Sequence, residues 1–467
     1  MDNKEKTGLN ISTKSFIVAI AVIFALMVLT YVITLAVPGG EYSRIPDANG
    51  NAVIDTSVPF KNVEGGISFW KWILSPVLVL TSDGSATIIA VIIFLIVIGG
   101  IFNALDRCGL MKYMLELISD RYGDRKYKLM AVVIFFFMAM GALIGSFEEC
   151  VPLVPIVVAL AISLGWDSLT GMGMSILAVG CGFASGVCNP FTVGVAQELA
   201  GLPMFSGLWL RLVAFALIYV LLLTFIKSHA KKVEREISPE AGTEFTADAK
   251  MSKALKLFAV ILGAGIILVL CSPFITALRD YTMIIVAVMF LVAGIVSTLT
   301  SGMKGRELGK TFKDGAISIL PAVIMILMAS SIKYTLETAH VLDTILHSAV
   351  GMASTMPKGA VILFIYLIVL VMNFFIASGS AKAFMLIPLI VPLAQLFDIP
   401  AQLCILAFAF GDGFSNVFYP TNPVLLISLG LSDLSYGEWA KWSGKFQISN
   451  LILTCALLLL GLAVGYC

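Results

Sequence analysis

Long apolar runs separated by short polar stretches fill most of the chain. Several runs approach or exceed the roughly 20 residues that a helix needs to cross a bilayer. They lie at residues 16–37, 87–104, 207–226, 255–270, 282–299, 316–335 and 448–464. We therefore predict an all-α polytopic membrane protein. Four further apolar stretches carry polar residues at their centres and need a different interpretation.

Two of these four stretches contain helix-breaking residues. Residues 171–200 include GCGFASGVCNP, which starts at Gly180, and residues 401–429 include FGDGFSNVFYPTNP, which starts at Phe410. Glycine and proline disrupt the internal hydrogen bonding that a helix in lipid requires, so we predict a broken transmembrane helix in each stretch. Broken helices near the membrane midplane form substrate sites in many secondary transporters.

The other two stretches indicate helical hairpins. Residues 129–165 have two apolar halves around a polar centre at 145–149, and residues 360–397 have the same pattern around 378–382. If both are re-entrant hairpins that turn back near the midplane, the chain has about nine spans plus two hairpins. The alternative, in which each hairpin is two full spans, stays open.

Similar residues recur at a nearly constant spacing in the two halves of the chain. Gly180 and Gly413 are 413 − 180 = 233 positions apart, and the same spacing separates Asn189 from Asn422. Because the elements around these residues also follow in the same order, the spacing indicates a duplication.

Clusters of lysine and arginine indicate how the repeats are oriented. They follow the runs that end near residues 104, 226 and 299, and the positive-inside rule places them, with the N-terminus, in the cytoplasm. The additional span at 255–270 turns the second half over, so we predict inverted repeats. Residues 1–227 form the first repeat, 228–253 a cytoplasmic linker, and 254–467 the additional span followed by the second repeat.

The composition excludes several functional classes. With 59% hydrophobic and 13% charged residues and a mean hydropathy of +1.00, the chain is unlike a soluble protein, and a net charge of +1 gives no footprint for nucleic acid. The sequence has no Walker motif for an ATP-driven pump, and no HExxH motif or nucleophile–base pair that suggests an enzyme. We expect no cofactor, a small-molecule substrate and membrane lipid as partners, and a bacterial inner (plasma) membrane location.

Four motifs lie at the hairpin centres and in the broken stretches. They are GSFEECVPLVPI at Gly145, GFASGVCNPFTVG at Gly182, SGSAKA at Ser378 and GDGFSNVFYPTNP at Gly411. These motifs resemble the YfcC-like family, in the C4-dicarboxylate anaerobic carrier-like group, which is related to basic amino acid antiporters and more distantly to short-chain fatty acid carriers. The resemblance implies secondary transport by a fold that pairs two re-entrant hairpins with two broken helices, often in a homodimer.

Charged residues near the membrane midplane are costly unless they are paired or hydrated, so each needs a role. Glu148 and Glu149, at the first hairpin tip, are candidates to bind a substrate amine or a coupling cation; alternatively, they are helix-end charges that reach interfacial water. Lys382, at 382 − 149 = 233 positions after Glu149, either neutralises a substrate carboxylate or pairs with one of the glutamates. Asp412 is a candidate proton or sodium ligand, unless it only caps the half-helix that follows.

Neutral polar residues complete the candidate substrate site. Hydroxyls, amides and exposed half-helix ends suit carboxylates and dehydrated Na+, although the same side chains also bond backbone carbonyls in ordinary membrane helices. A coupling Na+ site would lie near Asn189, Asp412 and Asn422, and H+ is the other candidate coupling ion. The neutral candidates are Ser146, Asn189, Thr192, Ser378, Ser380, Ser415, Asn416, Thr421 and Asn422.

The three acids and one lysine of this predicted site favour a substrate that carries an amine. We therefore expect a secondary active transporter that exchanges amino acids, basic ones in particular, by alternating access. A Na+- or H+-coupled transporter of C4-dicarboxylates or short-chain carboxylates is the alternative within this class. A channel is a weaker alternative, because polarity is concentrated at the middle of the helices whereas their ends are apolar.

Overall fold

The structure is a computed structural model that describes residues 13–46, 52–55, 57–82, 85–122, 125–145, 147–203, 205–235, 248–271, 282–353 and 356–467. Within these residues, ten helices are long and apolar enough to cross a membrane. The prediction of an all-α multi-pass membrane protein is therefore confirmed.

The first part of the chain forms long helices joined by a loop that contains short strands. Strand β1 pairs with β4, and β2 with β3, both antiparallel. These strands lie between the apolar runs at 16–37 and 87–104 and were not predicted from the sequence. The elements are α1 (Thr13–Ala36), β1 (Gly40–Glu41), β2 (Arg44–Pro46), β3 (Ala52–Ile54), β4 (Lys61–Asn62), α2 (Phe69–Ile73), α3 (Ser75–Leu78), a 3-10 turn (Val79–Thr81), α4 (Ser85–Arg107) and α5 (Leu110–Tyr122).

A helical hairpin and an interrupted helix come next. The first hairpin consists of α6 (Lys126–Ile144), a 3-10 segment (Glu148–Leu153) and α7 (Val154–Ser163). The first interrupted helix has a break at residues 186–189. Its elements are α8 (Ser168–Met172), a π-helical turn (Gly173–Leu177), α9 (Ala178–Ser185), a second π-helical turn (Pro190–Gly194) and α10 (Val195–Leu199), and α11 (Leu208–Val233) follows it.

The middle of the chain packs as a group of long helices around α4. Helix α4 contacts α13 and α14, α12 packs along α13, and α1 packs along α15. Helix α11 ends at Val233 and α12 begins at Ala249, so both helices extend into the linker predicted at 228–253; residues 236–247 of that linker lie outside the described part. The elements are α12 (Ala249–Cys271), α13 (Thr282–Ser301), α14 (Gly305–Ser318), α15 (Leu320–Thr338) and α16 (Leu342–Ala353).

The last part repeats the order of a hairpin, an interrupted helix and a long helix. The second hairpin is α17 and α18, and the second interrupted helix is α19 and α20, with a break at residues 417–422. The elements are α17 (Lys358–Phe375), α18 (Gly379–Leu396), α19 (Ala401–Asn416), α20 (Pro423–Leu431) and α21 (Tyr436–Ala463).

The two sets of elements start at matching positions in the sequence. Helices α8 and α19 start at 401 − 168 = 233 positions apart, and the elements after the two breaks start at Pro190 and Pro423, again 233 positions apart. Helices α6 and α17 start 358 − 126 = 232 positions apart. The spacing seen in single residues therefore extends to whole elements.

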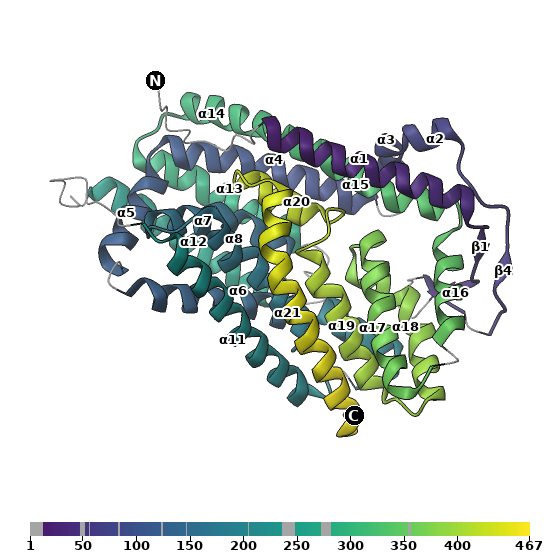
Figure 1. Ribbon diagram of the computed structural model, residues 1–467. Helices are drawn as coiled ribbons and strands as arrows, with labels where there is room; N and C mark the ends of the chain where they lie inside the picture. Colours follow the sequence, from purple (N-terminus) through teal and green to yellow (C-terminus); the bar gives the residue numbers. More distant parts are fainter. Residues whose placement is uncertain are drawn as a thin grey trace.

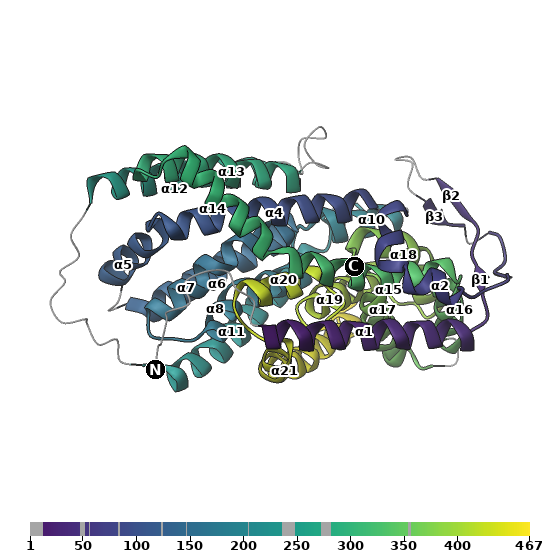
Figure 2. The same cartoon turned by 90° about the horizontal axis from the view of Figure 1, so that it is seen from above.

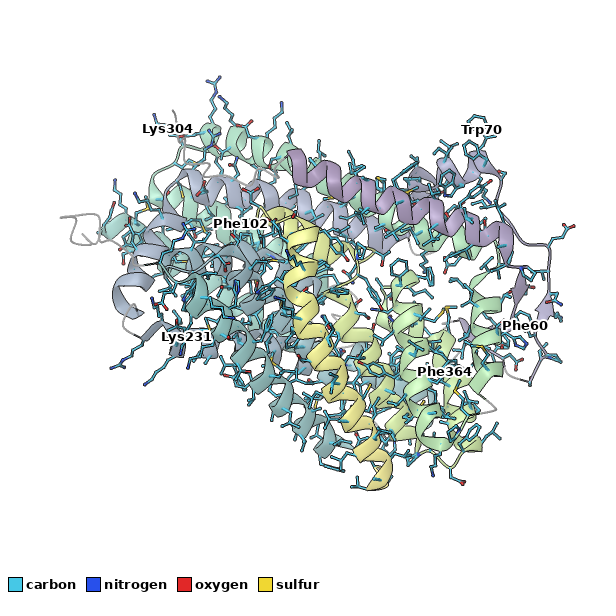
Figure 3. The ribbon with its side chains drawn as sticks, in the orientation of Figure 1. Phe60, Trp70, Phe102, Lys231, Lys304 and Phe364 are labelled. Atoms are coloured by element: carbon cyan, nitrogen blue, oxygen red, sulfur yellow. The ribbon has the colours of Figure 1, made fainter. Side chains whose placement is uncertain are left out.

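The two hairpins lie on opposite sides of α19. Figures 1 and 2 both show α6 and α7 to its left and α17 and α18 to its right. The strands and α16 lie at the right end of the molecule and α5 at the left end (Figure 1). Lys231 and Lys304 lie towards the left end, whereas Phe60 and Trp70 lie at the right end (Figure 3).

The interrupted helices form the most deeply buried part of the described chain. Of the window Ser168–Ser185, 89% is buried, and every residue from Gln402 to Asn416 is buried. The expected broken helices are present, but Gly411 and Gly413 do not break the second one, because both lie inside α19. A Cβ on Gly411 would lie 2.6 Å from Val369 Cγ1 of α17. These glycines allow close helix packing, as small residues do in membrane proteins.

Candidate functional site

The two interrupted helices cross at residues that share the 233-residue spacing. A Cβ on Gly180 would lie 2.3 Å from Val417 Cγ1, and a Cβ on Gly413 would lie 2.3 Å from Ala184 Cα. Val417 and Ala184 are themselves 417 − 184 = 233 positions apart. The contact between α9 and α19 is therefore reciprocal, and it packs residues at or near the two breaks against the other interrupted helix.

The asparagine of each Asn-Pro pair hydrogen-bonds the backbone after its break. Asn189 Oδ1 accepts from the backbone N–H of Thr192 at 3.3 Å. Asn422 Oδ1 accepts from the N–H groups of Val424 at 2.9 Å and Leu425 at 3.4 Å, and Asn422 is the N-cap of α20. The two asparagines therefore help to end the breaks, which is the ordinary role of an N-cap residue.

The first hairpin tip lies against the first break. Gly145 adopts a left-handed conformation with φ 75°, and a Cβ there would lie 2.2 Å from Asn189 Oδ1. Glycine has no Cβ, so both the turn and the close contact with Asn189 are possible. Gly145 of the tip and Asn189 of the break thus join the hairpin to the interrupted helix of the same half.

The second hairpin tip lies against both interrupted helices. A Cβ on Gly379 would lie 2.4 Å from Thr192 Cγ2 and 2.6 Å from Asp412 Oδ2. Thr192 belongs to the first half of the chain and Asp412 to the second. Gly379 therefore marks the point where one hairpin tip and the two interrupted helices meet.

Lys382 and Asp412 form a fully buried ion pair. Lys382 Nζ lies 2.7 Å from Asp412 Oδ1, and neither side chain has solvent exposure. Nζ also donates to the backbone carbonyl of Ile376 at 3.0 Å and to Asn373 Oδ1. Of the two alternatives for Lys382, the pairing with Glu148 or Glu149 is wrong, because α18 packs against α19 and brings the ammonium to Asp412 instead.

Asn373 connects this ion pair to the polar residues of α19. Its Nδ2 donates to Ser415 Oγ at 2.6 Å, to Asn416 Oδ1 at 3.0 Å and to the carbonyl of Asp412 at 3.0 Å. Asn422 Nδ2 also donates to Asn416 Oδ1, at 2.9 Å. Asn373 was not among the predicted site residues, although a single asparagine in the apolar run of α17 was a signal for it.

Asp412 does not cap the half-helix after the break. It lies inside α19, and Asn422 fulfils the capping role. Its Oδ1 accepts from Lys382, but its Oδ2 is buried and has no hydrogen-bond partner among the described residues. A buried carboxylate oxygen without a partner is costly, so this atom is a candidate ligand atom.

Glu148 and Glu149 begin the 3-10 segment at the first hairpin tip, and both are half-buried. The ion pairs between described residues do not include either of them, whereas Lys382 is already paired with Asp412. Glu149 Oε2 is buried and has no hydrogen-bond partner in the described part of the chain.

The remaining candidates differ in their surroundings. Thr192 and Thr421 are buried, and the hydroxyl of each has no hydrogen-bond partner within the described residues. Ser378 is exposed and caps α18 by accepting from the N–H of Ala381 at 3.5 Å, and Ser380 is half-buried. Ser146 lies outside the described residues. The site therefore offers free hydroxyls at the two breaks, next to an excess of carboxylate.

In the described chain, no group of three or more His, Cys, Asp or Glu residues could hold a metal ion. The Na+ site that the sequence suggested has oxygen donors, but Asn189 Oδ1 and Asn422 Oδ1 already accept hydrogen bonds from backbone N–H groups. Asp412 Oδ2 is the candidate cation ligand that keeps a free oxygen.

Comparison with known proteins agrees with the motifs at this site. A family model described as "DcuC: C4-dicarboxylate anaerobic carrier" matches residues 16–463. The chain is 30% identical over 414 residues to an Escherichia coli protein named "Putative basic amino acid antiporter YfcC". The matched region covers 82% of this chain and 79% of that protein. It is also 23% identical over 381 residues to an uncharacterized protein of Haemophilus influenzae, covering 77% of this chain and 73% of that one.

Two solved structures are similar over nearly the whole chain. The YdaH transporter of Alcanivorax borkumensis matches with a TM-score of 0.45 and 18% identity, covering 97% of this chain and 99% of that one. MtrF of Neisseria gonorrhoeae matches with a TM-score of 0.43 and 16% identity, covering 94% of each chain.

Proposed function

We propose that this chain, which belongs to the DcuC family of C4-dicarboxylate anaerobic carriers, a family of transporters rather than enzymes, exchanges amino acids, basic ones in particular. The exchange would run across the bacterial inner membrane by secondary active transport.

The balance of charges in the candidate site is the observation that favours an amine-bearing substrate. Lys382 and Asp412 neutralise each other, which leaves Glu148 and Glu149 as two acids with no cation partner among the described ion pairs. The two glutamates are neighbours in the sequence and half-buried, so their carboxylates repel each other, and a substrate ammonium or guanidinium relieves that repulsion. An amine-bearing substrate fits this site better than a simple carboxylate, because Lys382, the buried lysine among the described residues, is already paired with Asp412.

The name of one relative also supports the exchange of basic amino acids. The Escherichia coli protein that is 30% identical to this chain carries the name of a basic amino acid antiporter. The polar groups around the breaks suit the other end of such a substrate, since the hydroxyls of Thr192 and Thr421 are buried and unpartnered within the described residues.

The arrangement of the elements supports alternating access. Matching element starts at spacings of 232 and 233 support two repeats, and the hairpins lie on opposite sides of α19 (Figures 1 and 2). Lysines at the left end of Figure 3 support a cytoplasmic left end, by the positive-inside rule. We propose that the repeats are inverted, that both hairpins are re-entrant, and that they move with the interrupted helices against the other helices. A homodimer stays a prediction from the sequence.

A transporter of C4-dicarboxylates is the second candidate, and the family description favours it. In that case Lys382 would have to leave Asp412 to meet a substrate carboxylate, with Asp412 accepting H+ or Na+. This candidate predicts binding that depends on Lys382, whereas amino acid exchange predicts binding that depends on Glu149.

Thermal stabilisation of the purified protein tests the substrate class. The panel contains arginine, ornithine, neutral amino acids, C4-dicarboxylates and short-chain carboxylates, each in NaCl and in KCl. A ligand at 100 times its Kd adds about 2.7 kcal/mol of stability. We expect a shift with amino acids that Glu149→Gln removes and that Glu307→Gln, an exposed acid on α14, retains. A shift with carboxylates alone would favour the second candidate.

A further inference from the structure

Oxygen atoms surround the ammonium group of Lys382. Nζ donates to Asp412 Oδ1 at 2.7 Å, to the Ile376 carbonyl at 3.0 Å and to Asn373 Oδ1. A lysine ammonium has three N–H donors and no acceptor, so these oxygens use all of them. The set combines a carboxylate, a side-chain amide carbonyl and a backbone carbonyl, all of which are hard oxygen ligands.

The position of the set in the fold is also that of a cation site. Ile376 is the C-cap of α17, so its carbonyl lies at the negative end of a helix dipole. In transporters, carbonyls at half-helix ends and in unwound segments coordinate coupling cations. Here these oxygens converge on a side-chain ammonium, and Asp412 Oδ2 is still buried with no partner in the described chain.

The equivalent position in the first half carries the opposite charge. Glu149 lies 382 − 149 = 233 positions before Lys382, and its Oε2 is buried and unpartnered among the described residues. One hairpin tip therefore contains a cation that belongs to the chain, whereas the other contains carboxylates that need one.

We propose that Lys382 is a tethered cation that fills a monovalent-cation site at the second hairpin tip. The site comprises Asp412, Asn373 and the Ile376 carbonyl, and in the native protein it binds no dissociable ion. Removing the ammonium converts it into a site for Na+ or a small alkylammonium ion. The inference deepens the proposed function and rests on it for one consequence only: a dissociable coupling cation, or the substrate amine, binds at the Glu149 tip.

An ordinary structural ion pair makes a different prediction. If Lys382 only neutralises Asp412 in a rigid protein interior, the space left by its side chain has no affinity for a free cation. Truncation would then destabilise the protein to the same extent in every salt. Rescue by a free cation that depends on Asp412 therefore separates the two accounts.

The test uses the full-length protein and reads its melting temperature in detergent. The variants are Lys382→Ala, the double variant Lys382→Ala/Asp412→Asn and, as a matched control, Lys441→Ala, an exposed lysine on α21. Each protein is titrated with NaCl or methylammonium chloride against choline chloride at constant ionic strength. Because the assay reads stability rather than transport, failure of the inference is distinguishable from failure of the proposed function.

In choline chloride, we expect Lys382→Ala to have a lower melting temperature than wild type. Na+ or methylammonium should raise the melting temperature of Lys382→Ala saturably, and by more than it raises that of wild type or Lys441→Ala. The double variant should lack this extra response. Recovery of folded Lys382→Ala only when Na+ or methylammonium is present throughout purification supports the inference equally. Three results would overturn the inference. The cation response of Lys382→Ala could equal that of wild type, the extra response could persist in the double variant, or folded Lys382→Ala could fail to be recovered in any of the salts.

Discussion

Gly413 packs directly against Ala184 where the two interrupted helices cross. A Cβ on Gly413 would lie 2.3 Å from Ala184 Cα, a distance at which the backbones must move apart. The contact recurs at the equivalent position, where Gly180 faces Val417. The crossing therefore fixes the distance between the two breaks, and with it the geometry of the candidate site.

Gly413→Ala should separate the two interrupted helices. We expect a loss of about 1–3 kcal/mol of stability, typical of overpacking in a tight interior, measured as a lower melting temperature in detergent. Gly309→Ala is the matched control, because nothing lies within 4 Å of a Cβ at that position of α14. It should leave stability unchanged or raise it by up to about 1 kcal/mol through helix propensity. Equal melting temperatures for the two variants would contradict the close crossing.

Asp412→Asn should destabilise the protein strongly, because it leaves the Lys382 ammonium buried without its counter-charge. Breaking a buried pair from one side costs about 3–5 kcal/mol, whereas replacing both partners by neutral groups costs much less. The double variant Lys382→Met/Asp412→Asn should therefore melt higher than Asp412→Asn alone. If the double variant instead melts lower than either single variant, the two side chains are not coupled in the folded protein.

Asp167, which lies between α7 and α8 and outside the candidate spans, makes a pH-dependent contact with His229 near the end of α11. Burial alone would raise the pKa of Asp167, but the hydrogen bonds with His229 and Thr170 outweigh it and hold that pKa below its ordinary value. A carboxyl whose pKa is lowered by folding stabilises the protein above its ordinary pKa, and this contribution disappears as the pH falls through the folded-state value.

Asp167→Asn should therefore cost up to about 1 kcal/mol at pH 7, since the pair is partly exposed. The difference from wild type should shrink below about pH 4, where the carboxyl is protonated in the unfolded chain and then in the folded one. Melting temperatures at the two pH values check this. Asp398→Asn, at an exposed loop residue, should show no such change, and a difference for Asp167→Asn that is independent of pH would contradict the assignment.

The sequence predicted the elements of the site because their signals are local. Apolar runs, helix breakers and a 233-residue spacing indicated the hairpins and interrupted helices, and Asn189 and Asn422 do lie at the ends of the breaks. The exact breaks were less predictable. Gly411 and Gly413 look like helix breakers, yet close packing against α17 and α9 keeps them helical.

The partners within the site could not be predicted, because they depend on packing between distant segments. Lys382 lies 30 residues from Asp412 in the sequence, and its pairing follows from the way α18 meets α19. Asn373 had no equivalent polar residue in the first half, so the repeat gave no reason to select it. The strands β1–β4 are short and lie in a polar loop, where alternation of apolar residues gives no clear pattern.

The central claim is that the unpaired acids of the first hairpin tip select an amine-bearing substrate. The direct test is counterflow of radiolabelled arginine into proteoliposomes that contain the purified protein and are preloaded with unlabelled arginine or ornithine. We predict saturable exchange that Glu149→Gln lowers at least tenfold, equivalent to about 1.4 kcal/mol or more, and that Glu307→Gln leaves intact. Exchange of C4-dicarboxylates without any exchange of amino acids, or arginine exchange that Glu149→Gln does not change, would contradict the claim.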